Sequence, residues 1–134
     1  MPHFSICIVI ILGLALLQSS HAQDSTIDEY LNPHNSARAV VGVPPLSWDT
    51  DIAAHAQDSD SPATVAVNKW VEQNANYDHD SNSCVGGACE KYTQVVWQDS
   101  TSVGCAHRWC QYGQAIIVAC NYSPPGNIAG QLPY

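Results

Sequence analysis

Residues 103–122, VGCAHRWCQYGQAIIVACNY, predict two β-strands joined by a tight turn. The stretch is rich in valine, isoleucine and aromatic residues, which favour extended strands. We expect the strands at Val103–Cys110 and Gln114–Tyr122, with Tyr112-Gly113 as a two-residue turn. The hairpin forms the antiparallel part of a sheet, and the other elements of the chain are placed around it.

The register of this hairpin places two cysteines opposite each other. With Tyr112-Gly113 as the turn, Cys105 faces Cys120, and opposed cross-strand residues can lie close enough for a disulfide. Cys110 lies an odd number of residues from Cys105 and therefore points to the other face of the sheet. A bulge in the hairpin would flip the pairing and change this assignment.

Five cysteines remain once Cys7, in the N-terminal apolar segment, is set aside. Cys84 and Cys89 bracket Val-Gly-Gly-Ala and can close a small loop of their own. Cys110 is then left as a free thiol, or it bonds to another chain. Metal binding by these cysteines is a poor alternative, because no histidine stands at finger-like spacing from them.

The rest of the chain predicts helices before the hairpin and an irregular tail after it. Helical spacing of apolar residues or a helix-start signal indicates helices within three ranges, Ile27–Ala37, Asp49–Ala56 and Ser61–Val71. Pro33 is expected to kink the first of them or to split off its first turn. Tyr92–Gln98 is predicted as a further strand. The tail Pro124–Tyr134 holds three prolines and two glycines, so we expect it to be extended and unpaired. The expected fold class is α+β.

Residues 1–22 predict a secretory signal peptide. An apolar block runs from Ile6 to Leu17, and Ser20-His21-Ala22 fits the small-x-small cleavage rule. A buried N-terminal helix is the alternative, but it would need a polar face. The block is too short to span a bilayer. We therefore expect one mature domain, residues 23–134, that is secreted and does not span a membrane.

The net charge, the missing catalytic motifs and the spacing of the histidines exclude several classes of function. The net charge of −8 argues against binding to nucleic acid or to anionic lipid. The sequence has no Gly-x-Ser-x-Gly motif and no phosphate-binding loop. The mature chain contains four histidines, and none of them shows metal-ligand spacing: His34, His55, His79 and His107. These patterns favour a protein that is not an enzyme.

Four segments together resemble the plant pathogenesis-related protein 1 family of the CAP superfamily, whose domain is also called SCP. They are LNPHNSAR at 31–38, YDHDSNSC at 77–84, YTQVVW at 92–97 and CNYSPPGN at 120–127. The resemblance spans nearly all of the mature chain. It implies an α-β-α sandwich in which an antiparallel sheet, here of about three strands, lies between helices. It also implies secretion into the apoplast and a role in plant defence.

The chain departs from the family where the family's cavity is lined by two His and two Glu. In the family, the first His and the first Glu belong to a segment between the second helix and the helix bearing Trp70. Here only residues 58–62 join these two helices, which implies that the segment has been deleted. Gln73 stands at the second Glu position and Lys91 at the second His position. An ammonium cannot bind a cation. The resemblance thus implies neither a metal nor another cofactor. In the family, the deleted segment also carries a cysteine, and its loss would leave Cys110 without a partner.

The resemblance also implies two possible functions, binding of a sterol and release of a signalling peptide. The loop 76–89 is similar to a sterol-binding region of the superfamily, and its apolar residues here are Tyr77, Val85 and Ala88. The partner is then a sterol or a pathogen surface. Alternatively, the tail from Pro124 resembles a segment that some members release, by cleavage after the residue matching Ser123, as a defence-signalling peptide for a receptor. A third possibility is that the deletion leaves a weakly functional chain.

Overall fold

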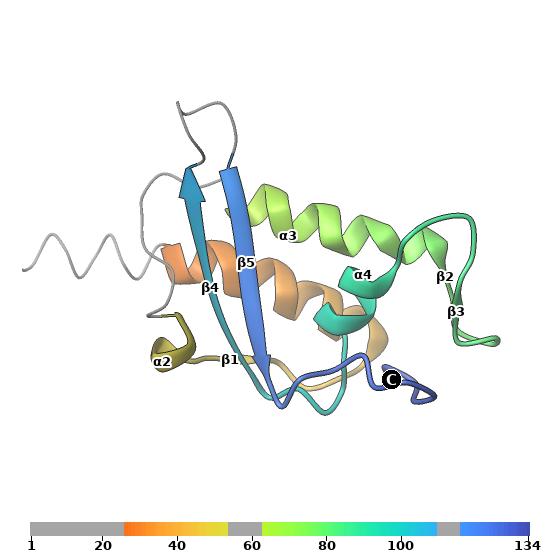
Figure 1. Ribbon diagram of the computed structural model, residues 1–134. Coiled ribbons are helices and arrows are strands. Elements are labelled where there is room, and N and C mark those ends of the chain that lie inside the picture. The colour runs from red at the N-terminus through yellow and green to blue at the C-terminus, as the bar shows by residue number, and fades with distance from the viewer. Residues whose placement is uncertain (1–25, 54–62, 110–115) are drawn as a thin grey trace, which may run out of the picture.

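The computed structural model describes residues 26–53, 63–109 and 116–134 (Figure 1). The predicted signal peptide, the 58–62 junction and the hairpin turn with Cys110 lie outside the described residues. The described elements begin with a helix of residues 26–41. They continue as β1 Ser47–Trp48, α2 Thr50–Ala53, α3 Ala63–Glu72, a 3₁₀ helix Gln73–Asn76, β2 Tyr77–Asp78, β3 Ser83–Cys84, α4 Glu90–Val95, β4 Ser102–Trp109 and β5 Ile116–Ser123.

The hairpin predicted from the sequence is confirmed as β4 and β5. The two strands pair antiparallel, and Cys105 lies directly opposite Cys120. The sheet has three strands in the order β1-β4-β5, and β1 pairs with β4 in the parallel direction. A separate two-stranded sheet joins β2 to β3. The main sheet is therefore mixed, and its third strand is β1.

The prediction of a strand at Tyr92–Gln98 is wrong, because most of this stretch forms helix α4. Tyr92, Val95 and Val96 are buried in one cluster with Ala37. Their spacing of three and four residues puts them on one face of a helix. Packing of this face outweighs the strand preference of the β-branched residues, which is weak and depends on context.

The central strand of the main sheet is covered on both faces. The helix 26–41 and α3 run side by side along one face (Figure 1), and their residues Tyr30, Ala63 and Val67 share a buried cluster with Val103 and Cys105 of β4. Val103–His107 of β4 is buried without interruption, although neighbouring side chains point to opposite faces. This burial is what an α-β-α sandwich requires of its central strand.

Arg38 connects the helix 26–41 to the segments that follow it and to α4. Its guanidinium is buried and donates hydrogen bonds to four main-chain carbonyls, those of Pro44, Val95, Trp97 and Ser100, at 2.7–3.1 Å. Burial lowers the pKa of Arg38 from its ordinary value. The four carbonyl dipoles replace the water that this charge gives up.

His34 joins the same helix to β5. Its Nδ1–H donates to the carbonyl of Tyr30 at 2.8 Å, and its Nε2 accepts from the Tyr122 hydroxyl at 2.6 Å. Burial in the core, with a smaller contribution from the charge of Arg38, lowers the pKa of His34 from 6.5 to about 4, against the opposing effect of the Tyr30 hydrogen bond. The imidazole is therefore neutral and serves as a core residue.

Candidate functional site

The structure brings together Gln73 and Lys91, the two positions that the resemblance assigns to lost ligands. The side-chain oxygen of Gln73 accepts a hydrogen bond from the backbone N–H of Lys91 at 3.1 Å. This bond satisfies one of the N–H groups left unpaired in the first turn of α4. Lys91 is exposed. Across residues 26–53, 63–109 and 116–134, no three His, Cys, Asp or Glu side chains form a metal-binding group.

A cavity of about 340 Å³ opens beside Lys91, between α4 and β5. Its apolar wall includes Trp70, Val118 and Tyr122, and Lys91 lies with Glu90, Gln94 and Asn127 among its polar lining residues. Gln73 is engaged with the helix terminus, and the Lys91 ammonium stands where the resemblance implies the second ligand. The donor set therefore does not fit a metal ion, because a protonated lysine offers hydrogen bonds but no lone pair.

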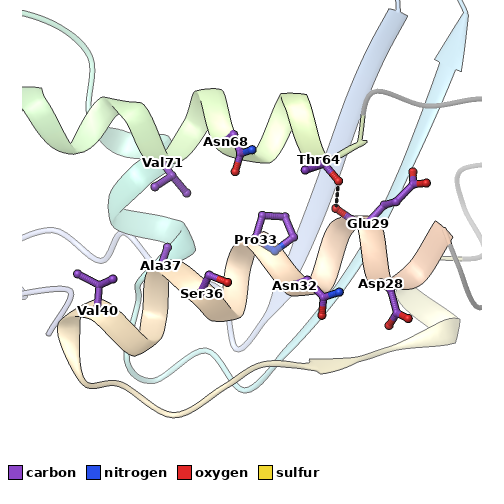
Figure 2. A pocket seen from close by; sticks show the side chains of 10 residues that line it. All are labelled: Asp28, Glu29, Asn32, Pro33, Ser36, Ala37, Val40, Thr64, Asn68 and Val71. Atoms are coloured by element: carbon purple, nitrogen blue, oxygen red, sulfur yellow. Dashed lines mark hydrogen bonds between the residues drawn. The ribbon is translucent and has the colours of Figure 1, made fainter.

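A larger groove of about 820 Å³ runs between the helix 26–41 and α3 (Figure 2). One end carries Ala37, Val40 and Val71, and the other carries Asp28 and Glu29. Val40 is 86% exposed, which leaves most of an apolar side chain open to a ligand. The groove thus offers an apolar end and an acidic end to one elongated molecule. Polar side chains lie between these ends, namely Asn32, Ser36, Thr64 and Asn68.

Pro33 explains how α3 is fixed against this groove. A proline inside a helix cannot donate to the carbonyl four residues earlier, which here belongs to Glu29. The Thr64 hydroxyl of α3 donates to that carbonyl at 2.9 Å, as the dashed line in Figure 2 shows. The helix 26–41 continues through Pro33, so the first turn is not split off.

The three apolar residues predicted for a lipid-binding loop do not converge. Tyr77 is half-buried, with ring centroids 6.0 Å from Tyr92 and 6.4 Å from Tyr134. Val85 is 59% exposed, and Ala88 is also exposed. A small pocket of about 180 Å³ is lined by Tyr77 but by neither of the other two residues.

Both cysteine pairs expected from the sequence are bonded in the structure. Cys84–Cys89 closes the loop after β3, and Cys105–Cys120 links β4 to β5 with a Cα–Cα distance of 4.0 Å. Cys89 and Cys105 are buried. Cys110 lies outside the described residues, and its unpaired state stays a prediction.

The tail 124–134 is not the unpaired segment expected from its composition. Asn127 accepts from Thr93 Oγ1 at 2.7 Å and donates to the Glu90 carbonyl at 2.8 Å. Pro133 is fully buried, and its carbonyl accepts from the backbone N–H of Gln98 at 2.7 Å. The tail therefore packs along α4, and sequence reasoning missed this because its contacts come from residues some 30 or more positions away.

Comparison with known proteins agrees with this architecture. Residues 55–122 match the Cysteine-rich secretory protein family, CAP. Among solved structures, Schistosoma mansoni venom allergen-like protein 4 superposes with a TM-score of 0.60 at 26% identity, over 72% of this chain and 86% of that one. MpPR-1i superposes with a TM-score of 0.61 at 21% identity, over 79% and 92%. The chain belongs to the CAP family.

The sequence relatives define the branch of the family. Pathogenesis-related protein 1B of Nicotiana tabacum is 43% identical over 100% of this chain and 95% of its own length. Pathogenesis-related protein 1 of Arabidopsis thaliana is 40% identical over 98% and 97%. The chain is thus a plant defence protein of the pathogenesis-related 1 type. The tobacco alignment covers 162 positions against 134 residues here, so at least 28 positions have no counterpart, in keeping with an internal deletion.

Within the described residues, no helix is long and apolar enough to cross a membrane.

Proposed function

We propose that this protein is secreted into the apoplast and acts in defence by binding a sterol or a similar rigid apolar molecule, without catalysis. The observation that carries the proposal is the groove between the helix 26–41 and α3. Its volume of about 820 Å³ lies in the range of small-molecule sites. A pathogen membrane or surface that supplies such a molecule is the corresponding partner.

The two ends of the groove suit the two ends of a sterol. The ring system and its alkyl chain need an apolar wall, which Ala37, Val40 and Val71 provide. The single hydroxyl needs a hydrogen-bond acceptor, and Asp28 and Glu29 lie at the opposite end. This site is favoured over the loop 76–89, because the apolar residues of that loop do not converge.

The proposal is tested by measuring the binding of a radiolabelled sterol to the purified protein. Ser36→Trp fills the groove and Val40→Asp places a charge at its apolar end, so each should weaken binding about tenfold or more. Val85→Asp tests the loop instead. Val65→Asp is the matched control, since Val65 is a 53% exposed valine of α3 that does not line the groove.

Unchanged binding by both groove variants would reject the groove as the site. If Val85→Asp alone weakens binding, the loop is the site and sterol binding itself stands. If wild-type protein retains no sterol, the proposed function is wrong. Secretion is checked separately: the protein recovered from apoplastic fluid should begin at Gln23.

A second candidate function is that of a peptide precursor. Ser123 and Pro124 are exposed, and the disulfide Cys105–Cys120 holds the chain just upstream of the bond between them. Cleavage there would yield the peptide 124–134 for a receptor. Mass spectrometry of apoplastic fluid after wounding should detect this peptide. If only intact chains ending at Tyr134 are found while related proteins in the same sample are cut, the tail is purely structural.

A further inference from the structure

Tyr134, the last residue of the tail, lies in an aromatic setting built by residues that follow β2 and by α4. Its ring stacks on His79, with centroids 4.8 Å apart and planes inclined by 24°. The imidazole Nε2–H donates to the main-chain oxygen of Tyr134 at 2.9 Å. The hydroxyl groups of Tyr134 and Tyr92 lie 3.2 Å apart. One tail residue thus makes two hydrogen bonds and a ring stack.

Hydrogen bonds are spread along the tail before Tyr134. The backbone N–H of Gly126 donates to the side chain of Gln94 at 2.8 Å. Asn127 makes the two bonds to α4 described above, and the side chain of Asn82 donates to the Gln131 carbonyl at 2.9 Å. These partners belong to residues 77–84 and 90–98, which we call the tail-binding surface. The tail is thus held by hydrogen bonds at several points along its length.

We propose that the tail-binding surface is a peptide-binding site whose ligand is a segment that carries Asn127, turns at Ala129-Gly130 and continues to Pro133-Tyr134. In the intact chain the ligand is the protein's own tail. After a cut between Ser123 and Pro124, the same contacts hold the tail noncovalently, so that cleavage and release are separate steps. A free copy of the segment competes for the surface.

The chemistry of the contacts supports binding without the covalent link. Nearly all of them form after Pro125, so a cut before Pro124 removes none of those at Gly126, Asn127, Gln131, Pro133 or Tyr134. Prolines in the tail reduce the conformational entropy that a free peptide loses on binding. The consequence for signalling rests on the proposed peptide release, whereas the binding site itself does not.

The experiment uses the folded full chain. A recognition sequence for a site-specific protease is inserted between Ser123 and Pro124, and the protein is cut after folding. Gel filtration and native mass spectrometry of the cut protein then measure how fast the tail peptide separates. We expect the wild-type peptide to co-elute with the domain. Added synthetic peptide 124–134 should displace it.

Three variants test which contacts retain the peptide. Tyr134→Ala and His79→Ala each remove the stack and a hydrogen bond, so dissociation should be about tenfold faster or more. Leu132→Ala is the control, since Leu132 is a 51% exposed tail residue, and it should stay within about twofold of wild type. His79 is exposed, so His79→Ala leaves the core unchanged. Tyr134 is half-buried against the cluster of Ala37, Tyr92, Val95 and Val96, so His79→Ala is the cleaner of the two tests.

Immediate separation of the wild-type peptide would overturn the proposal. Equal dissociation rates of the Tyr134→Ala and Leu132→Ala peptides would also overturn it. So would free exchange of the Gly126 amide with solvent in the protein that carries the inserted protease site but has not been cut. None of these results bears on whether plants cut the chain, which is read from apoplastic fluid. The two ideas therefore fail independently.

Discussion

Acidification should destabilise the protein through His34. The folded state lowers the pKa of His34 from 6.5 to about 4, so between these values the unfolded chain binds a proton that the folded protein does not. Stability therefore falls as the pH drops below about 6.5 and levels off below about 4. At about 1.4 kcal/mol for each tenfold change, the full penalty is about 3 kcal/mol.

The part of this penalty that falls between about pH 7.5 and about pH 5 is about 2 kcal/mol. Urea denaturation at the two pH values measures it in wild type and in His34→Gln. Glutamine can replace both hydrogen bonds of the imidazole but does not titrate. The variant should therefore lose about 2 kcal/mol less than wild type on acidification, whatever its stability at the higher pH.

The difference between wild type and His34→Gln cancels the contribution of the other titrating groups to the pH dependence of unfolding, because these groups are common to both proteins. A difference below about 0.5 kcal/mol between the two pH dependences would refute the reasoning. A second measurement is the NMR titration of the imidazole in the folded protein. Protonation of the His34 ring near its ordinary pKa of 6.5 would show that the core does not exclude its charge.

Arg38→Met should cost about 3–5 kcal/mol in thermal or chemical unfolding, because four buried carbonyls lose their donor; a cost below about 1 kcal/mol would contradict this. Gly126→Ala places a Cβ 2.5 Å from the buried indole of Trp97 and should cost about 1–3 kcal/mol, seen as faster amide exchange in the tail. Calorimetric titration should find no stoichiometric zinc binding, and zinc binding abolished by changes at both Gln73 and Lys91 would disprove the assignment. Peptide mapping without reduction should find Cys110 outside any bridge within the chain.

The hairpin and its disulfide could be predicted because both follow from local pattern. A two-residue turn determines the register of the strands that it joins, and the register puts Cys105 opposite Cys120. The helices of residues 26–41 and 63–72 are likewise indicated by the spacing of their apolar residues. Family membership rested on four short segments and is confirmed by the relatives. Each of these inferences uses residues close in sequence or matched as a string.

Helix α4 and the tail could not be predicted in this way. Tyr92–Trp97 favours a strand by composition, and only the cluster with Ala37 shows that a helical face is buried. The tail lacks any periodic pattern, so its composition suggested an unpaired segment. Its partners lie in residues 77–84 and in α4, and no local rule links these positions to Tyr134.

By itself, the sequence determined the fold class, the family and the strand register, and the resemblance led us to predict that Gln73 and Lys91 stand at the family's ligand positions. Only the tertiary structure shows that Tyr92 packs in one cluster with Ala37 of the helix 26–41. It also shows that the Thr64 hydroxyl donates to the Glu29 carbonyl, to which Pro33 cannot donate, and that His79 donates to the main-chain oxygen of Tyr134. Turns and the register of a hairpin depend on neighbours in the chain. Side-chain hydrogen bonds and ring stacking depend on atoms that only the folded chain brings within a few ångströms of each other.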